Sequence, residues 1–277
     1  MRDRAAYAEH IAEVLAGPHG AKVGYPIGLR ELRVLRRAAL SSALLRLTFG
    51  GPELDGFHSY VPDEHIRLIF PCADGVLRLP RRDGLSLEWG DPRPVSREYT
   101  VRRYEHGELD VDFAIHPGGL ASEWALAAEP GARIHIAGPP GGVVVPPGYD
   151  RYLFAGDITA LPAIARWLES LAPTARGWAV VEVRDESERI PLPAPPGIEV
   201  RWAYRGGIAP GSGDALERAV RTVRPPAGER IYVWMAAEAG VLRPLRRWVR
   251  GTLGVGPKDC LIAGYWKRGV ADFDREE

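Results

Sequence analysis

Arg97, Tyr99 and Thr100 are the residues of this 277-residue chain whose types and spacing first suggest chemistry. Arg97 and Tyr99 share one face of an extended strand, because side chains alternate between the two faces. A guanidinium can bind a pyrophosphate, a phenol ring can stack on a flat heterocycle, and a hydroxyl can reach the edge of that heterocycle. The set suits a flavin dinucleotide, with Thr100 near the flavin N5 edge and Arg97 at the phosphates.

The segment that follows has the pattern of a strand that ends in a glycine-rich turn. Its alternation predicts a strand over 108–115 with an apolar row on one face, made of Leu109, Val111, Phe113 and Ile115. The alternation stops at His116, and the turn 117–119 leads into a predicted helix. Free backbone N–H groups near 120–122 predict an anion site that shares the pyrophosphate with Arg97.

Three ordered segments resemble the siderophore-interacting proteins, which are flavin-dependent ferric-siderophore reductases of the wider ferredoxin-reductase-like group. Residues 97–100 are similar to the family's Arg-x-Tyr-Thr, residues 112–116 to Asp-Phe-x-x-His, and residues 119–125 to Gly-Pro-Ala-Ser-x-Trp-Ala. The similarity continues from residue 30 to the C-terminus. It implies that Tyr99 and Thr100 are catalytic, and that FAD is contacted by Arg97, Tyr99, Thr100, Val101, His116, Gly119, Ala121, Ser122 and Trp124.

The turn after His116 departs from the family pattern in two ways. One residue is missing between His116 and Gly119, and Leu120 stands where the family has proline. We therefore expect the turn at the flavin to have a different shape in this chain.

A second motif opens the C-terminal half of the chain. Residues 156–163 resemble the family's Gly-Asp-Glu-Thr-Ala-Leu-Pro-Ala, with Ile158 in place of the glutamate. We expect Thr159 to be the N-cap of a helix and Pro162 to lie in its first turn, so that a dinucleotide phosphate could bind at the helix end. Without the resemblance, an ordinary strand-to-helix turn is favoured, because the Gly-x-Gly-x-x-Gly spacing is missing.

Two later segments extend the resemblance. Residues 234–239 are similar to Trp-x-Ala-Gly-Glu-Ala, and residues 264–269 to Gly-Tyr-Trp-Arg-x-Gly. Ala237 replaces a glycine and is expected to narrow a ligand pocket. Glu238 fits a functional role and a place at a helix N-terminus equally well. The resemblance implies further cofactor contacts at Gly156, Asp157, Thr159, Ala237, Glu238, Tyr265 and Trp266.

The adjacent aromatic residues 265 and 266 can cover a flavin face, although simple docking of a C-terminal tail also explains them. An anionic substrate needs positive charge near the flavin edge. By position, the candidate substrate-binding residues are Arg67, Lys267 and Arg268.

The elements that must position these residues fall into two classes. The first half predicts an all-β, six-stranded antiparallel flavin-binding barrel, with strands over 32–35, 44–49, 65–70, 97–104, 108–115 and 132–137, and a long loop over 72–94. The second half alternates strands (152–155, 178–183, 198–203, 231–235, 261–263) with helices (159–171, 213–223, 241–253). This alternation predicts a mostly parallel α/β nucleotide-binding domain, and residues 184–197 are expected to form a loop.

These patterns divide the chain into three parts. Residues 1–29 hold an amphipathic helix over 4–16 and a lead-in, residues 30–147 form the FAD-binding barrel, and residues 148–277 form the NAD(P)H-binding-like domain with its aromatic tail.

The composition of the chain argues against several other classes of protein. Hydrophobic residues make up 45% and charged residues 26%, as in ordinary globular proteins. The chain has 36 basic and 36 acidic residues, so no net charge attracts nucleic acid or an anionic membrane. No signal sequence or spanning segment is evident, which predicts a cytoplasmic protein. The histidines show no metal-ligand spacing, and no metal site is expected.

The leading prediction is a cytoplasmic FAD-dependent ferric-siderophore reductase, in which NADH or NADPH reduces the flavin and the flavin reduces chelated Fe(III). The choice of dinucleotide stays open, because Arg184 and Arg189 suit a 2′-phosphate whereas Asp185 and Glu186 suit a ribose hydroxyl. One alternative is a flavoprotein of the same fold fed by ferredoxin. Another is a redox-silent scaffold that binds a small molecule.

Overall fold

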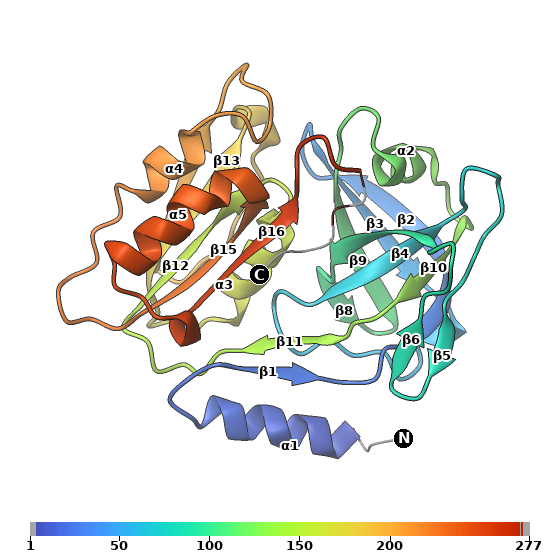
Figure 1. The fold of residues 1–277 in the computed structure, drawn as a ribbon, viewed down its shortest axis with the longest axis horizontal. Helices are drawn as coiled ribbons and strands as arrows, with labels where there is room; N and C mark the ends of the chain where they lie inside the picture. Colours follow the sequence, from blue (N-terminus) through green and yellow to red (C-terminus); the bar gives the residue numbers. More distant parts are fainter. Residues whose placement is uncertain (1–3, 272, 274–277) are drawn as a thin grey trace. The chain divides into compact units, whose positions relative to one another are not determined.

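The computed structural model describes residues 4–271 and 273, so the ends of the predicted first and last parts, residues 1–3, 272 and 274–277, lie outside the described residues. The described chain forms two compact units, one of residues 4–8 and 22–143 and the other of 9–21 and 144–271 with 273 (Figure 1). The predicted N-terminal helix is present as α1 (Arg4–Leu15).

The first unit is built on an antiparallel sheet that curls into a half-barrel (Figure 1). In the described part of the chain its seven strands are β2 (Leu29–Ala39), β3 (Leu44–Gly50), β4 (His65–Phe70), β7 (Val95–Thr100), β8 (Arg103–Glu105), β9 (Glu108–Ala114) and β10 (Arg133–Ala137). Their order across the sheet is β7-β4-β10-β2-β3-β9-β8. The antiparallel class of this domain is as predicted.

The predicted count of six strands is wrong by one, because the expected strand over 97–104 is divided. The backbone N–H of Val101 bonds to the Glu64 carbonyl, and that of Arg102 bonds to the Asp110 carbonyl. The chain therefore leaves its pairing with β4 at this point and begins to pair with β9. β7 and β8 are consequently the two edges of one sheet.

Shorter elements complete the first unit. They are η1 (Pro52–Leu54), α2 (Leu120–Ala127), the pair β1 (Ala21–Gly24) and β11 (Gly141–Val144), and the hairpin β5 (Arg81–Asp83) and β6 (Ser86–Glu88). The hairpin lies inside the segment predicted to be a long loop. It is anchored by Leu87, which packs in a small cluster with Ile69 and Ala137.

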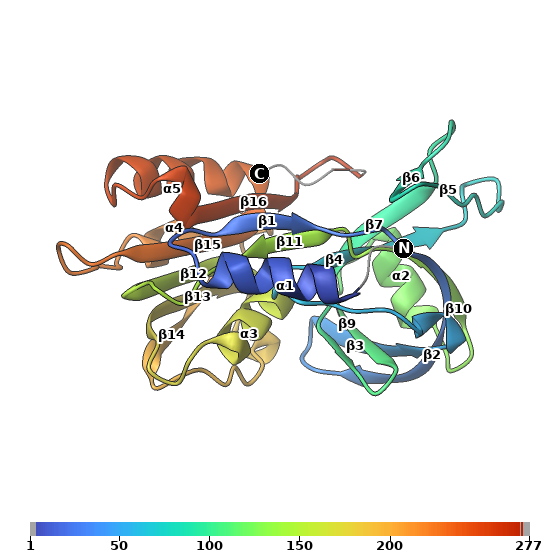
Figure 2. The ribbon, with the colours of Figure 1, turned by 90° about the horizontal axis from the view of Figure 1, so that it is seen from below.

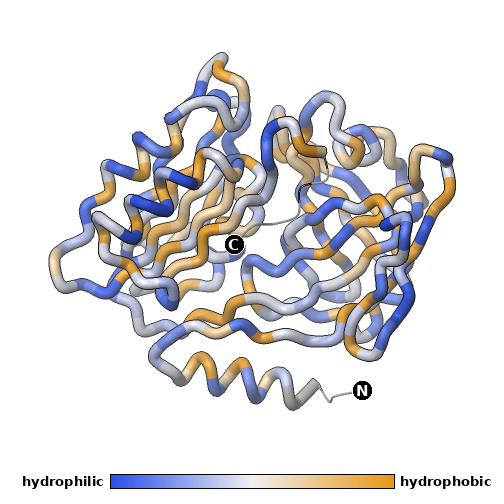
Figure 3. Tube along the Cα trace, in the orientation of Figure 1, coloured by the Kyte–Doolittle hydropathy of each residue, from blue (hydrophilic) through white to orange (hydrophobic). Residues whose placement is uncertain are grey.

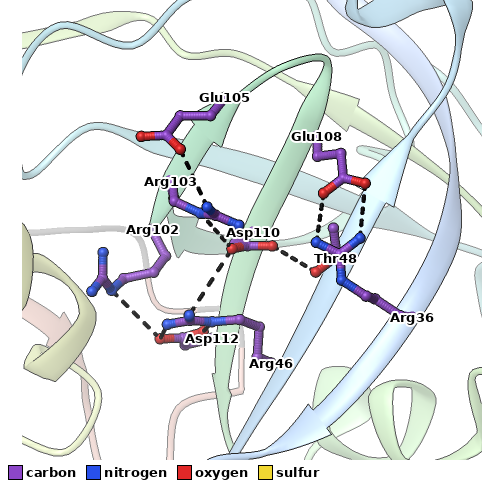
Figure 4. Close-up of polar contacts among 9 residues, drawn as sticks. All are labelled: Arg36, Arg46, Thr48, Arg102, Arg103, Glu105, Glu108, Asp110 and Asp112. Carbon is purple, nitrogen blue, oxygen red and sulfur yellow. Dashed lines mark hydrogen bonds and ion pairs between the residues drawn. The ribbon is translucent and has the colours of Figure 1, made fainter. Parts of the chain in front are cut away.

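Both faces of β9 are buried, although its sequence predicts only one apolar face. Its apolar residues, including Phe113, join the main core of the half-barrel. On the other face the carboxylates of Asp110 and Asp112 are 2% and 3% exposed. Burial of these two carboxylates is tolerated because side chains of β3 and β8 donate hydrogen bonds to them (Figure 4).

The geometry of these partners is close to ideal. Arg46 donates from Nε and Nη2 to the two oxygens of Asp112, at 2.6 and 2.8 Å. The Thr48 hydroxyl donates to Asp110 at 2.6 Å, and Arg103 Nε donates to the same carboxylate at 2.9 Å. The network holds β8 and β9 in register with β3.

The second unit is a parallel α/β sheet. Among the described residues its strands are β12 (Arg151–Asp157), β13 (Arg176–Val183), β14 (Gly197–Tyr204), β15 (Ile231–Glu238) and β16 (Cys260–Trp266), in the order β14-β13-β12-β15-β16. All the strand pairs are parallel, and every strand predicted in this half is present. The apolar strands are visible as adjacent orange traces in Figure 3.

Helices cover both faces of this sheet, as predicted. α3 (Leu161–Ser170) lies on one face and α5 (Ala239–Gly251) on the other (Figure 2). α4 (Ala215–Val220) packs in the same core as α5. The short elements are η2 (Glu186–Glu188) and η3 (Pro257–Asp259), and in the described chain η2 is the only helical turn within 184–197, where a loop was expected.

Candidate functional site

The ring of Tyr99 lies on a group of aromatic side chains from three elements of the first unit. Tyr99 of β7 meets Phe113 of β9 at 4.4 Å between ring centroids, and Phe113 meets Trp124 of α2 at 6.3 Å. Burial raises the pKa of the Tyr99 phenol, which keeps it protonated. The sheet edge that carries Tyr99 and the helix after His116 therefore share one apolar base.

The pairing of β7 with β4 fixes which side chains share a face. Arg97 and Tyr99 are opposite Leu68 and Ile66, both fully buried core residues, so the predicted common face of Arg97 and Tyr99 is confirmed. Thr100 is the next residue and lies on the other face.

Arg67 lies on the face opposite to Arg97, because its cross-strand neighbour is Glu98. Its Nη2 donates to Glu98 at 2.5 Å, and its Nη1 donates to the Ser96 hydroxyl at 3.4 Å. The structure does not bring Arg67 to the face that carries Arg97 and Tyr99. Its charge is also engaged by a carboxylate, which makes it a weaker candidate for binding an anionic substrate.

The turn after β9 depends on a glycine. Gly118 has a φ of 72°, in the left-handed region that favours glycine. A Cβ atom at Gly119 would lie 2.3 Å from Cε1 of the exposed His116 imidazole, which would then have to move. The Ser122 hydroxyl accepts from the His116 backbone N–H and donates to the Ala114 carbonyl, both at 3.2 Å. Ser122 thus joins the helix to the end of the strand.

α2 begins directly after this turn, as predicted. Gly119 is its N-cap, and within the described residues no side chain caps it. The backbone N–H groups of its first turn are therefore free of side-chain acceptors, which is the arrangement that binds phosphate. Val101 and Ala121 are 0% and 5% exposed, so neither side chain is open to a ligand, and the Val101 N–H already bonds to the Glu64 carbonyl.

Trp124 has a packing role that the sequence motif did not reveal. Its ring stacks on Phe49 at 6.4 Å and 12° and meets Phe70 edge-on at 5.9 Å. This position against the core fixes α2, and with it the uncapped first turn.

At the carboxyl edge of the second sheet, Asp157 is only 8% exposed and is surrounded by donors. Its Oδ1 accepts from the backbone N–H and the hydroxyl of Thr159, at 2.9 and 2.5 Å. Its Oδ2 accepts from the Glu238 backbone N–H at 3.1 Å and from Trp266 Nε1 at 2.8 Å. Burial raises the pKa of this carboxyl, and the hydrogen bonds act in the opposite direction.

The start of α3 differs from the prediction in one residue. Ala160 is its N-cap, whereas the Thr159 hydroxyl bonds to Asp157. Pro162 does lie in the first turn. Gly156 lets β12 approach its neighbours, because a Cβ atom there would lie 2.4 Å from the Ala236 carbonyl oxygen.

Glu238 caps α5, which is one of the two roles left open by the sequence. Its Oε2 accepts from the Val241 N–H at 2.9 Å, and its Oε1 accepts from the Arg268 N–H at 3.2 Å. Ala237 is 1% exposed and packs in the core beside α5. Its methyl group does not line an open pocket.

The C-terminal aromatic residues are half-buried at the end of β16. Tyr265 meets Trp234 edge-on at 6.2 Å, and Trp266 is held by Asp157. Lys267 and Arg268 follow directly in the chain, and Arg268 also donates to the Ser212 hydroxyl. Ser212 and the neighbouring Gly211 were missed by sequence reasoning, because no motif marks their turn.

The residues that left the choice of dinucleotide open are paired with one another. Arg184 donates to Asp185 at 2.8 Å, and Arg189 lies 3.7 Å from Glu186. Hydrogen bonds from Ser187 and Arg184 hold the pKa of Asp185 at about 2. The cations and acids therefore remain together on one exposed loop, and the choice of dinucleotide stays open.

Two further observations concern metal ions and membranes. Among residues 4–271 and 273, no group of three or more His, Cys, Asp and Glu side chains could hold a metal ion. No helix in the described chain is long and apolar enough to cross a membrane.

Solved structures share this two-unit fold. The siderophore utilization protein from T. fusca is 36% identical, with a TM-score of 0.87 over 92% of this chain and 98% of that one. SipS from Aeromonas hydrophila is 29% identical, with a TM-score of 0.74 over 89% and 93%. A ferredoxin reductase of carbazole 1,9a-dioxygenase, at 18% identity and a TM-score of 0.61 over 87% and 70%, shares the fold alone. The fold is therefore ferredoxin-reductase-like.

Sequence relatives define the family more closely. Ferric vibriobactin reductase ViuB of Vibrio cholerae is 33% identical over 248 residues, which are 87% of this chain and 90% of the relative. The NADPH-dependent ferric-chelate reductase of Escherichia coli is 34% identical over 250 residues, 88% and 95% of the two chains. Residues 33–143 match the siderophore-interacting FAD-binding domain, and residues 149–269 match the siderophore-interacting protein domain.

The chain belongs to the siderophore-interacting protein family. Its first unit is an FAD-binding domain, and the protein is a flavin-dependent oxidoreductase. The residues of this unit fit the cofactor, because the uncapped first turn of α2 supplies phosphate-binding N–H groups and β7 supplies a guanidinium and a phenol ring on one face.

Proposed function

We propose that this protein is a ferric-siderophore reductase of the cytoplasm that takes electrons from NADH or NADPH. The observation that carries the proposal is its similarity, over at least nine tenths of their lengths, to two relatives named as ferric reductases. The fit of the first unit to FAD supports it. NADPH is the donor named for one of these relatives.

In this proposal the first unit binds the FAD cofactor. Arg97 and the first-turn N–H groups of α2 bind the pyrophosphate, and Tyr99 presents its ring to the isoalloxazine. Thr100 ends β7 on the other face and is 7% exposed, so its hydroxyl is assigned to the flavin N5 edge only at the point where the strand ends. Bound FAD supplies a site that accepts a hydride and delivers electrons one at a time.

The substrate is an Fe(III) complex with hard, mostly anionic oxygen ligands. Lys267 and Arg268 are the proposed cations that attract it, and Arg67 is the weaker third candidate because it is paired with Glu98. Fe(II) carries less charge and is softer than Fe(III), so oxygen ligands hold it less tightly after reduction. Release of iron from the siderophore follows.

The proposal is tested by steady-state assay of the FAD-loaded protein with a ferric siderophore and a colorimetric Fe(II) trap. Fe(II) should form with NADPH or NADH and should stop when the protein is omitted. If Fe(II) forms at the same rate with protein lacking FAD, or does not form with either nucleotide or any other electron donor, the proposed function is wrong.

A second candidate is a ferric reductase of the same fold that is fed by a ferredoxin. The departure at Ile158 favours it, because a half-buried isoleucine stands where the family has a glutamate. Rapid mixing distinguishes the two. If reduced ferredoxin bleaches the flavin quickly and neither nucleotide does, the donor is the carrier protein.

A further inference from the structure

Three strand ends of the second unit meet at one buried carboxylate. Asp157 ends β12, Glu238 ends β15 and Trp266 ends β16. The pairing of β15 with β16 shifts register between Ala237 and Glu238, which brings Glu238 opposite Trp266. We refer to Asp157, Glu238 and Trp266 as the strand-end cluster.

Asp157 has no acceptor capacity left for a ligand. A carboxylate offers about four lone-pair positions. In the described structure Asp157 receives four hydrogen bonds, two from Thr159, one from the Glu238 backbone and one from the Trp266 indole. Any effect of Asp157 on a reaction must therefore pass through the groups that it holds.

The Glu238 carboxylate accepts two hydrogen bonds, one from the N-terminus of α5 and one from the backbone of Arg268. Gly211 packs directly against Glu238 and Trp266. A Cβ atom there would lie 2.7 Å from Cγ of Glu238 and 2.9 Å from Cη2 of Trp266. The next residue, Ser212, accepts a hydrogen bond from the Arg268 guanidinium. The cluster thus determines the course of the chain from residue 266 to 268.

We propose that Asp157 and Glu238 are positioning residues, which hold the Trp266 ring and the Arg268 backbone so that Lys267 and Arg268 are presented to the ferric chelate. This inference rests on the proposed function for the identity of the substrate. It gives both acids a role different from the cofactor contact that the family motif implies.

The first test asks whether the carboxylate controls the indole, and it needs no activity. In a ¹⁵N-labelled sample of the full chain, the Nε1–H signal of Trp266 is assigned by its loss in Trp266→Phe. A hydrogen bond to a buried carboxylate moves this signal downfield and slows its exchange with solvent. In Asp157→Asn, which keeps the volume but loses the charge, we expect an upfield shift and exchange faster by about tenfold.

Trp167 is the internal reference for this measurement, because its Nε1 is buried and has no hydrogen-bond partner in the described structure. Its signal should not move in Asp157→Asn. If the Trp266 signal also stays unchanged, Asp157 does not hold the indole and the proposal is overturned.

The second test measures kinetics, with Glu182→Gln as the matched control. Glu182 is the next-to-last residue of the neighbouring strand β13 and pairs in register with Asp157. It is 7% exposed, and it accepts from the Leu216 N–H of α4 at 3.1 Å. Burial raises the pKa of both carboxyls. The control therefore loses a similar buried charge that does not support residues 266–268.

Asp157→Asn and Trp266→Phe should each raise KM for the ferric chelate about three- to tenfold, with FAD content unchanged. The double variant should be no worse than the more affected single variant, because one hydrogen bond is lost in all three. Glu182→Gln should keep the wild-type KM.

Equal increases in KM for Asp157→Asn and Glu182→Gln would assign the effect to general destabilisation and overturn the proposal. If the wild-type protein reduces no ferric chelate, the proposed function fails and the positioning of Lys267 and Arg268 for such a substrate fails with it. In that case the shift of the Trp266 signal still decides whether Asp157 holds the indole.

Discussion

Single residues at this site are best understood by what their polar atoms are already bonded to. Arg97 and Arg67 lie on adjacent strands of the half-barrel, but Arg97 is opposite Leu68 and donates to the Ser96 carbonyl, whereas Arg67 is opposite Glu98 and donates to its carboxylate. Asp157 and Glu238 resemble cofactor ligands in the sequence, but their oxygens accept from backbone and indole donors. Residue type alone could not show which of these arginines and acids are already bonded to other groups of the protein.

Arg97→Ala should lose FAD, because a charge-assisted hydrogen bond to a phosphate contributes about 1.5–3 kcal/mol, or about ten- to hundredfold in affinity. The measurement is the FAD content after gel filtration, followed by titration of the apoprotein. Arg67→Ala is the matched control and should retain FAD, since the Arg67 guanidinium is paired with Glu98 across the strand pair. Retention of stoichiometric FAD by Arg97→Ala would remove Arg97 from the cofactor site.

Ile158→Glu tests the residue that departs from the family pattern. If the missing carboxylate orients the nicotinamide, the variant should be reduced faster by NADPH or NADH, by a factor of a few to about ten, because a placed hydrogen bond contributes about 0.5–1.5 kcal/mol. Reduction by dithionite, which needs no binding site, is the control and should not change. A lower Tm without a gain in nucleotide turnover would instead show that Ile158 is a packing residue.

At the scale of secondary-structure elements, the repeating apolar patterns predicted where strands and helices form, but not the residues at which some of them begin or end. Short apolar runs predicted all five strands of the parallel sheet, because buried strands must be apolar on both faces. The division of 97–104 into β7 and β8 could not be predicted, since it depends on backbone bonds to Glu64 and Asp110. The N-cap at Ala160 was missed because Asp157 attracts the Thr159 hydroxyl.

The polar face of β9 provides a prediction at this scale. Arg46→Met removes the two hydrogen bonds that Asp112 receives from Arg46 and leaves Arg102 Nε at 3.8 Å from the buried carboxylate, so it should lower the free energy of unfolding by about 3 kcal/mol. Arg36→Met removes an exposed pair with Glu108 and should cost no more than about 1 kcal/mol. Urea unfolding of both variants measures the difference. Similar losses would mean that the buried network does not hold the half-barrel together.

For the whole molecule, the family motifs predicted the order of an FAD-binding unit and an α/β unit, and the family matches cover both. The motifs could not predict which side chains of distant segments their residues would contact. Asp157 and Trp266 are 109 positions apart, and their hydrogen bond exists only because parallel strands bring their carboxyl ends to the same edge.

The most direct measurement of the proposed function is a single-turnover experiment on the whole protein loaded with FAD. The flavin is reduced under anaerobic conditions with NADPH or NADH and is then mixed with a ferric siderophore and an Fe(II) trap. We expect the oxidised flavin spectrum to return and about two Fe(II) to be trapped per flavin, because the flavin carries two electrons and each iron accepts one. A flavin that stays reduced in the presence of the ferric siderophore, but is reoxidised by oxygen, would contradict the assignment of this protein as a ferric-siderophore reductase.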